Sequence, residues 1–221
     1  MSRLQPLWVS VEGIEGAGKT HLCRKLASQL GASCLLVDEI SDHGKDTQEG
    51  QVVAALLAGG DPFLRTGHPA AESLALLALK ARAYSRVMSA AMPRTRLVLE
   101  DRGPDTVAAY QPAILSPGGK TTELLASARQ ILATAAWSRP MPDLTLLITD
   151  DPGICEQRFA TRIGRPVTDD ERTLMRQAAT LYELLAQAEP QRWHVISRQG
   201  RTSREVLAAM AAACAEGESR A

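Results

Sequence analysis

Residues 13–20 form the pattern G-x-x-x-x-G-K-T, directly after the apolar segment 8–12. Glycines at these spacings let successive backbone N–H groups point at anionic oxygens, and a helix begun near Gly18 would aim its positive dipole end at the same place. The Lys19 side chain would reach the outer phosphates of a nucleoside triphosphate, and the Thr20 hydroxyl would ligate magnesium. The residues expected to hold the nucleotide are Gly13, Glu15, Gly16, Ala17, Gly18, Lys19 and Thr20.

The flanking sequence argues against a glycine turn with only a structural role. Leu22, Leu26 and Leu30 share one face of the helix expected after the motif, and Gly31 would end that helix. A strand before the motif and a helix after it are the context that a phosphate-binding loop requires. We therefore expect the chain to bind a nucleoside triphosphate with magnesium.

A second pair of residues, Asp101 and Arg102, follows the apolar segment 96–100. In open α/β sheets, ligands bind beyond the carboxyl ends of the strands, so both side chains would lie beside the glycine-rich motif. There Asp101 would hold magnesium through water, and the Arg102 guanidinium would bind a phosphate. The alternative is an ordinary ion pair at the surface.

Short segments rich in branched apolar residues alternate with longer segments dominated by alanine and leucine. The strands are expected at 7–12, 34–39, 96–100, 143–149 and 192–197. Beyond the helix after Gly18, helices are expected at 46–58, 69–92, 104–115, 119–136, 152–160, 170–189 and 202–216. This alternation predicts an α/β fold, with a five-stranded parallel sheet and helices on both faces. The length of 221 residues favours a single domain over 1–221.

Two irregular stretches interrupt the alternation. Residues 59–68 contain glycine and proline, and residues 161–170 contain Arg162-Ile163-Gly164-Arg165-Pro166. Long loops in a phosphate-handling α/β protein are candidates for closing over a substrate. We expect the second stretch to form a lid at about 159–170.

The composition excludes several other classes of function. Lysine plus arginine and aspartate plus glutamate both number 25, and this balance argues against a general binder of nucleic acid or of anionic membranes. Neither a signal-peptide core nor a run of about 18 apolar residues is present. The four cysteines and four histidines lack zinc-binding spacing. We therefore expect a cytoplasmic protein with reduced thiols and with no nucleic-acid or membrane partner.

Four motifs together resemble those of the thymidylate kinase family of nucleoside monophosphate kinases, across nearly the whole chain. They are VEGIEGAGKT at 11–20, the segment 101–111 from Asp-Arg to Ala-Tyr-Gln, Pro-Asp-Leu-Thr at 142–145, and the stretch 162–171. The resemblance implies the P-loop NTPase fold, ATP and magnesium as cofactors, and a small-molecule phosphate acceptor. It also implies a homodimer through the helices at 46–58 and 69–92. The implied activity is that of a phosphotransferase converting dTMP, or a related or modified monophosphate, to the diphosphate.

The resemblance also implies catalytic arginines in the lid, because Ala17 occupies a position that is arginine in some members. The candidates are Arg158, Arg162 and Arg165. Independently of the family, a transferred phosphoryl group spreads negative charge over its oxygens, and arginines that close over it without water stabilise that charge. The alternative is a solvated helix whose acidic residues 169–171 merely pair with these arginines.

Three further residues are implied to contact the acceptor. By resemblance, Glu15 approaches the sugar hydroxyl or the metal, and Tyr110 lies against the sugar and disfavours a ribose. Tyr110 is equally well explained as a core aromatic of its helix. Glu39 stands at the position of the family's Arg-Glu-Pro loop, but residues 40–45 do not continue the expected Arg-Glu-Pro-Gly-Gly.

The positions that read the base in the family differ in this chain. Leu76 replaces a phenylalanine that stacks on thymine, and Lys80 replaces an arginine that hydrogen-bonds the base. Val107 replaces a polar residue that faces the base, and Gly103 replaces an aromatic residue. A missing polar partner changes discrimination by orders of magnitude, so we expect dTMP to be held less well than in typical members.

Two other functions remain open from the sequence. One is a P-loop kinase that acts on a non-nucleotide metabolite of a specialised pathway, and the other is a non-catalytic nucleotide-binding regulator. A guanine-reading switch normally needs Asn-Lys-x-Asp, and this chain contains no asparagine.

Overall fold

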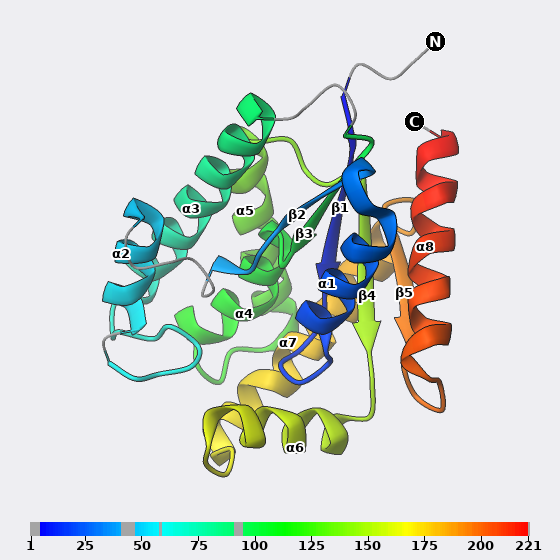
Figure 1. Ribbon diagram of the computed structural model, residues 1–221. Coiled ribbons are helices and arrows are strands. Elements are labelled where there is room, and N and C mark those ends of the chain that lie inside the picture. Colours follow the sequence, from blue (N-terminus) through cyan, green and yellow to red (C-terminus); the bar gives the residue numbers. More distant parts are fainter. Residues whose placement is uncertain (1–4, 41–46, 58, 91–94, 221) are drawn as a thin grey trace.

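Five parallel strands form one sheet in the computed structural model, which describes residues 5–40, 47–57, 59–90 and 95–220 (Figure 1). The strands are β1 (Leu7–Glu12), β2 (Cys34–Val37), β3 (Leu97–Asp101), β4 (Leu144–Thr149) and β5 (Trp193–Ser197). Their spatial order is β2-β3-β1-β4-β5, which places β1 at the centre between β3 and β4. The predicted five-stranded parallel sheet is confirmed.

Helices cover both faces of the sheet, so its strands are apolar on both sides. On one face lie α1 (Lys19–Leu30) and α8 (Ser203–Arg220), which bury Leu22 and Met210 against Val9. The opposite face is covered by α3 (Pro69–Ala90), α4 (Pro104–Leu115), α5 (Thr121–Ser138) and α7 (Asp169–Ala188). None of the described helices is long and apolar enough to cross a bilayer.

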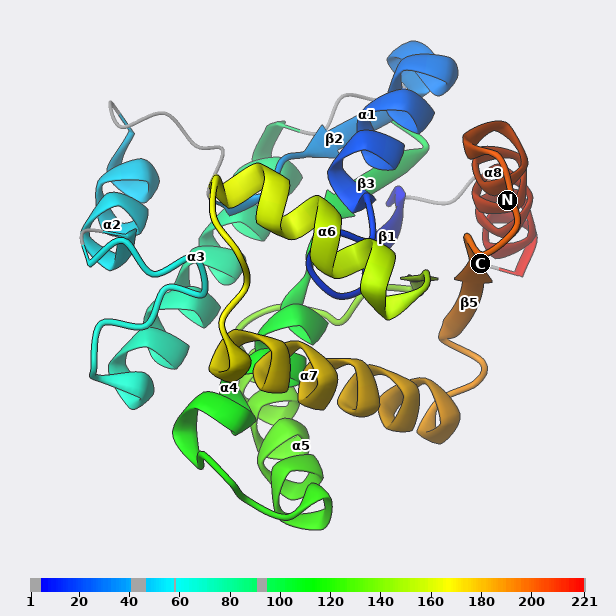
Figure 2. The same ribbon diagram turned by 90° about the horizontal axis from the view of Figure 1, so that it is seen from below.

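Two further helices flank the sheet. α2 (Gln48–Leu57) lies beside α3, and α6 (Pro152–Ile163) lies below the carboxyl ends of the strands (Figure 2). A single 3-10 turn, Gly31–Ser33, connects α1 to β2. The position of α6 brings its arginines toward the edge of the sheet at which the P-loop lies.

The predicted elements differ from the observed ones mainly at their ends. β2 stops at Val37 rather than at 39, and α8 runs on to Arg220. α6 extends to Ile163, three residues past the predicted end, because the helix is closed by Gly164 in the left-handed conformation with φ 71°.

The irregular stretch predicted at 161–170 is shorter in the structure. It comprises residues 164–168, since α7 already begins at Asp169, where Thr168 and Glu171 form a capping box. Residues 59–68 lack helix and strand, as predicted. The ends of the predicted helices at 46, 58 and 91–92 lie outside the described residues, as do His43 and most of the loop after Glu39.

The carboxyl ends of β1 and β3 bring the two sequence motifs together. In the parallel register between these strands, Val11 pairs with Asp101. The P-loop leaves β1 after Glu12, and Arg102 leaves β3 at the same edge. The candidate site is therefore built at the central strand pair, as expected for an open α/β sheet.

Candidate active site

The P-loop, residues 13–20, curls tightly between β4 and α6. A Cβ atom on Gly13 would lie 2.3 Å from the Ile148 carbonyl oxygen, and a Cβ atom on Gly16 would lie 1.9 Å from the Cys155 carbonyl oxygen. Both glycines also have positive φ angles, of 141° and 77°. Glycine adopts such angles without strain, so these two positions permit the curl that a phosphate-binding loop requires.

Lys19 lies across this loop. Its Nζ donates to the Ile14 carbonyl oxygen at 2.8 Å, and the side chain is buried. Burial and the neighbouring Arg102 lower the pKa of Lys19, and the carboxylates of Glu15 and Asp101 oppose that shift. The Lys19 ammonium therefore lies where the donor phosphates would lie, and positively and negatively charged side chains surround it.

Asp101 has a buried carboxylate whose two oxygens make no hydrogen bond of good geometry to the described residues, although the Thr20 hydroxyl lies close enough to lower its pKa. Burial raises the pKa of Asp101, and Arg102, Thr20 and Lys19 partly offset that rise. Unpaired buried carboxylate oxygens are costly unless a ligand satisfies them. An aspartate and a threonine hydroxyl beside the P-loop are the oxygen ligands that suit Mg²⁺.

Arg102 is buried and joins two carboxylates from separate segments. Its Nη2 lies 2.7 Å from Glu15 Oε1, and its Nε lies 2.9 Å from Glu39 Oε1. Burial alone would raise the pKa of Glu15, but Arg102, Lys19 and Arg162 lower it to about 2. Glu15 is therefore ionised at neutral pH, and the structure brings the predicted acidic and basic residues into one cluster.

The three candidate lid arginines have different surroundings. Arg162 pairs with Glu15 and stacks over the Phe159 ring, with its guanidinium carbon 5.2 Å from the ring centroid. Arg158 pairs with Asp150 at 2.7 Å and donates to the Gly16 carbonyl oxygen at 3.3 Å.

Arg165 points elsewhere. It makes a two-pronged ion pair with Glu171, in the first turn of α7, at 2.8 and 2.6 Å. The structure thus brings Arg158 and Arg162 to the P-loop and leaves Arg165 in the pairing with acidic lid residues that was the alternative at this position.

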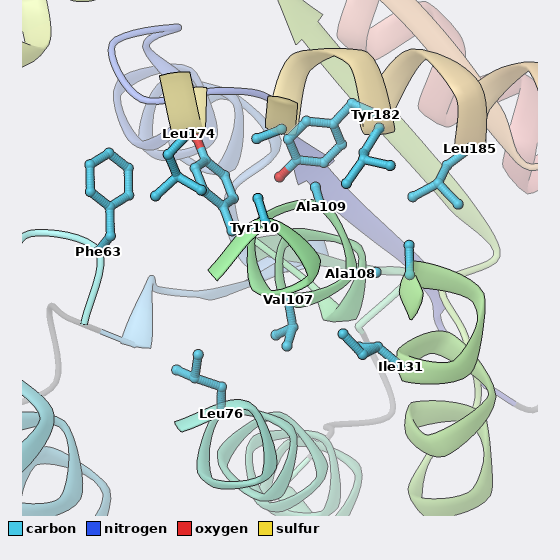
Figure 3. Close-up of a cluster of buried hydrophobic side chains, with 14 of the residues drawn as sticks. Phe63, Leu76, Val107, Ala108, Ala109, Tyr110, Ile131, Leu174, Tyr182 and Leu185 are labelled. Carbon is cyan, nitrogen blue, oxygen red and sulfur yellow. The ribbon is translucent and has the colours of Figure 1, made fainter. Parts of the chain in front are cut away.

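A cleft of about 470 Å³ opens beside the P-loop. Among its walls are nine residues expected at the site: Glu15, Thr20, Glu39, Leu76, Lys80, Arg102, Val107, Tyr110 and Arg162. In Figure 3, Leu76 projects from α3 toward Val107 on α4, and Phe63 and Tyr110 lie across from them. The cleft therefore has an apolar end and a charged end.

Tyr110 connects the apolar part of the cleft to the P-loop. Its hydroxyl oxygen accepts the backbone N–H of Glu15 at 3.1 Å. Its ring packs in the core, 5.7 Å from the Phe63 ring centroid and 6.4 Å from that of Tyr182. Tyr110 is therefore a core aromatic that also lines the cleft, and its contact with a sugar stays a prediction.

Lys80 lies in the wall of the cleft, and its ammonium group contacts the backbone and a buried carboxylate. The Nζ donates to the Arg102 carbonyl oxygen and lies 3.7 Å from Glu100 Oε1. Glu100 is fully buried and also accepts from Arg139 at 2.9 Å and from the Trp8 indole at 2.6 Å. The charge of Lys80 is thus balanced in the core.

Sequence reasoning missed two polar residues at the site. Gln111 lines the cleft, and its side-chain oxygen accepts from Ser73 at 2.8 Å, which leaves the amide NH₂ as its donor. Arg198, just after β5, donates to the Ala17 carbonyl oxygen at 2.6 Å. Gln111 follows Tyr110 in the quoted motif and was within reach of the sequence, whereas nothing local marks Arg198.

Sequence reasoning also missed Glu12, the last residue of β1, whose carboxyl group accepts hydrogen bonds from several segments. Its Oε1 accepts the Ser10 hydroxyl at 2.6 Å and the Gly103 N–H at 2.7 Å. Its Oε2 accepts the hydroxyls of Tyr182, at 2.9 Å, and Thr106. Burial and the nearby Asp105 raise the pKa of Glu12 to about 7, although these hydrogen bonds act against the shift.

Glu12 should therefore make stability depend on pH. The folded protein holds this proton more tightly than the unfolded chain, so its contribution is complete below the ordinary value of 4.5 and is lost as pH rises to about 7. We expect the unfolding free energy of the wild type, minus that of Glu12→Gln, to fall by up to roughly 3 kcal/mol between pH 4.5 and 8. Urea unfolding at each pH measures this difference. The exposed variant Glu183→Gln is the control, and a pH-independent difference for Glu12→Gln would contradict the assignment.

Known proteins are similar to this chain over almost its whole length. The family model "Thymidylate kinase" matches residues 11–208. The chain is similar to a thymidylate kinase of Cereibacter sphaeroides, with 33% identity over 218 residues that cover 96% of this chain and 95% of the relative. It is also 34% identical to a thymidylate kinase of Deinococcus radiodurans over 87% of this chain and 88% of the relative.

Solved structures give the same fold. The chain is similar to a crystal structure of thymidylate kinase from Ehrlichia chaffeensis, with a TM-score of 0.66 and 18% identity over 94% of this chain and 97% of that one. A thymidylate kinase structure from Candida albicans gives a TM-score of 0.63 and 16% identity, over 94% and 90% of the two chains. The predicted P-loop NTPase fold is confirmed.

Proposed function

The chain belongs to the thymidylate kinase family, and we infer that it transfers the γ-phosphoryl group of ATP to dTMP, giving dTDP. It is a phosphotransferase with ATP as co-substrate and a small nucleotide as acceptor. The main support for this site is that one cleft is lined by the P-loop residues Glu15 and Thr20, by Arg102 and by an apolar wall. A nucleoside monophosphate has the matching two ends, an anionic phosphate and a flat, largely apolar base.

The charged end of the cleft accounts for phosphoryl transfer. Lys19 and the P-loop N–H groups would hold the donor phosphates, and Thr20 and Asp101 would hold magnesium. Magnesium, when bound, neutralises phosphate charge. The unpartnered oxygens of Asp101 support this assignment.

Arg102 is proposed to grip the acceptor phosphate. Its two present partners are the side-chain oxygens of Glu15 and Glu39, at 2.7 and 2.9 Å, so an anionic phosphate oxygen can take the place of one of them. Arg162 and Arg158 lie close enough to the P-loop to stabilise charge on the transferred group.

The apolar end is proposed to receive the thymine ring between Leu76, Val107 and Phe63. Because the Lys80 ammonium is committed to the Arg102 carbonyl, the Gln111 amide is left as a polar donor for the base. Fewer polar contacts mean weaker discrimination among pyrimidines. The departures from the family pattern therefore affect selectivity more than catalysis.

Gln111→Leu should raise the KM for dTMP about tenfold, as expected for the loss of one buried hydrogen bond of roughly 1.4 kcal/mol. The KM for ATP should not change, because Gln111 lines only the acceptor cleft. Initial rates at varied concentrations of each substrate measure both constants. Gln130→Leu, the same change at an exposed position of α5, is the control. Equal effects of Gln111→Leu on both KM values would argue against an acceptor contact.

A homodimer and a cytoplasmic location are further parts of the proposal. The exposed apolar side chains Val52 on α2 and Leu74 on α3 support a dimer through these helices. All four cysteines are free thiols, as expected in a reducing compartment. Light scattering on the purified protein tests the dimer, and a monomeric mass would contradict it.

An acceptor screen with ATP and magnesium tests the proposed function. It should include dTMP, dUMP, dCMP, dAMP, dGMP and a non-nucleotide sugar phosphate. We expect turnover of dTMP, with dUMP following it closely because the pocket wall is mostly apolar. Turnover of another acceptor without turnover of dTMP would overturn the acceptor assignment.

A further inference from the structure

The backbone at Arg102 adopts a conformation that its side chain disfavours. Its φ angle is 64°, in the left-handed region, and Leu64 is the only other described non-glycine residue with a positive φ. Such a conformation persists only where the surroundings impose it. The Arg102 N–H donates to the Val11 carbonyl oxygen at 3.1 Å, which holds one side of the residue.

Two buried ionisable side chains grip the peptide group that follows Arg102. The Lys80 ammonium, from α3, donates to the Arg102 carbonyl oxygen. The Gly103 N–H donates to Glu12 Oε1, from β1, at 2.7 Å and to Ser10 Oγ at 3.0 Å. Lys80 is 3% exposed and Glu12 is 0% exposed, so neither interaction competes with bulk water.

The position after Arg102 has no room for a side chain. A Cβ atom on Gly103 would lie 2.5 Å from Ser10 Oγ and 3.1 Å from Ser10 Cβ, and 3.3 Å from Glu12 Oε1. The peptide therefore packs directly against β1, where Glu12 can reach it. The glycine found at this position in place of an aromatic residue is the one residue type that fits this contact.

The grip directs the Arg102 side chain. With its backbone fixed on both sides, the guanidinium reaches Glu15 in the P-loop and Glu39 beyond β2. A peptide freed to rotate would swing the guanidinium away from both. A cationic donor on the carbonyl and a buried carboxyl oxygen that accepts the next N–H favour a single orientation of that peptide.

We propose that Lys80 and Glu12 are positioning residues that clamp the Arg102–Gly103 peptide from opposite ends and thereby aim Arg102 at the acceptor phosphate. Lys80 then takes no part in reading the base. The inference rests on the proposed role of Arg102 in binding that phosphate. It assigns to Lys80 a task different from the base contact implied by its place in the sequence.

The test is the gain in affinity that a phosphate confers, measured by calorimetry as the Kd of thymidine divided by the Kd of dTMP. The ratio is measured for the wild type and for the variants Lys80→Met and Glu12→Gln. If the clamp exists, the ratio in each variant is at least about tenfold lower than in the wild type, because the charge-assisted contact of Arg102 with the phosphate is misdirected. Lys80→Arg keeps a cationic donor for the carbonyl and should retain most of the ratio. Glu12→Gln is nearly isosteric, so it supplies the test even if Lys80→Met does not fold.

Leu76→Ala serves as the matched control in the cleft wall. It should weaken thymidine and dTMP alike and leave the ratio unchanged. An unchanged ratio in Glu12→Gln and in a folded Lys80→Met would overturn the inference. So would a Lys80→Met variant whose preference between dTMP and dCMP changes, since that result would show base reading.

This binding test gives a result that does not depend on whether the proposed function is correct. Binding is measured without turnover, and absence of phosphoryl transfer from ATP to dTMP concerns only the acceptor assignment. If the acceptor screen identifies another monophosphate, the same ratio is measured with that nucleotide and its nucleoside. The ratio of the two Kd values alone then decides whether Lys80 and Glu12 position Arg102.

Discussion

Lys19→Ala is expected to lower kcat on the order of a thousandfold or more, the upper range for loss of one preorganised charge donor. The Lys19 ammonium lies across the P-loop and donates to the Ile14 carbonyl oxygen, where the donor phosphates would lie. The fold should persist, because the glycine geometry of the loop and the packing of α1 on the sheet do not depend on this side chain. Initial rates with ATP and dTMP measure the loss, and far-UV circular dichroism checks the fold.

Lys25→Ala provides the matched control for this prediction. Lys25 is exposed on the same helix, about 1.7 turns further along, and its removal changes the net charge equally. It should leave kcat unchanged. Wild-type turnover by Lys19→Ala would contradict the assignment of residues 13–20 as the donor site.

Arg162→Ala is expected to lower kcat on the order of a hundredfold, with a smaller effect on KM, because its guanidinium acts on charge that develops in the transition state. The geometry separates it from Arg165, although the sequence places both in the lid. Arg162 reaches Glu15 in the P-loop, whereas Arg165 is held by Glu171. Arg165→Ala should therefore lower kcat much less.

Single-turnover rates for the two arginine variants check this order. They separate the chemical step from product release, which limits kcat in many enzymes that close a lid. Equal losses in both variants would show that the Arg165–Glu171 pair opens in the reactive state. An unchanged rate in Arg162→Ala would show that Arg162 is an ordinary surface charge with no part in catalysis.

The sheet and the phosphate end of the site were predictable because their signals are local. A parallel strand buried on both faces is a mostly apolar run, and residues 7–12 and 144–149 show that pattern with two polar residues in each segment. The P-loop is a fixed spacing of a few residue types, and its place after β1 sets the position of Lys19. Asp101 and Arg102 could be placed because they follow a neighbouring strand.

The remaining features depend on contacts between residues far apart in the chain. Lys80 and Arg102 are 22 residues apart, and the sequence does not show that the ammonium turns to the Arg102 carbonyl rather than to a base. The contact between Arg198 and Ala17 spans 181 residues. The bounds of the irregular stretch were wrong by a few residues because the αL turn at Gly164 and the capping box of Thr168 decide them.

The central claim is that this site moves the γ-phosphoryl group of ATP onto dTMP. Its most direct test incubates the purified protein with magnesium, dTMP and ATP labelled at the γ-phosphate, and follows the label by chromatography. The account predicts that the label appears in the β-phosphate of dTDP, that its appearance requires dTMP, and that Lys19→Ala prevents it. Label released only as inorganic phosphate, at a rate independent of dTMP, would contradict the account.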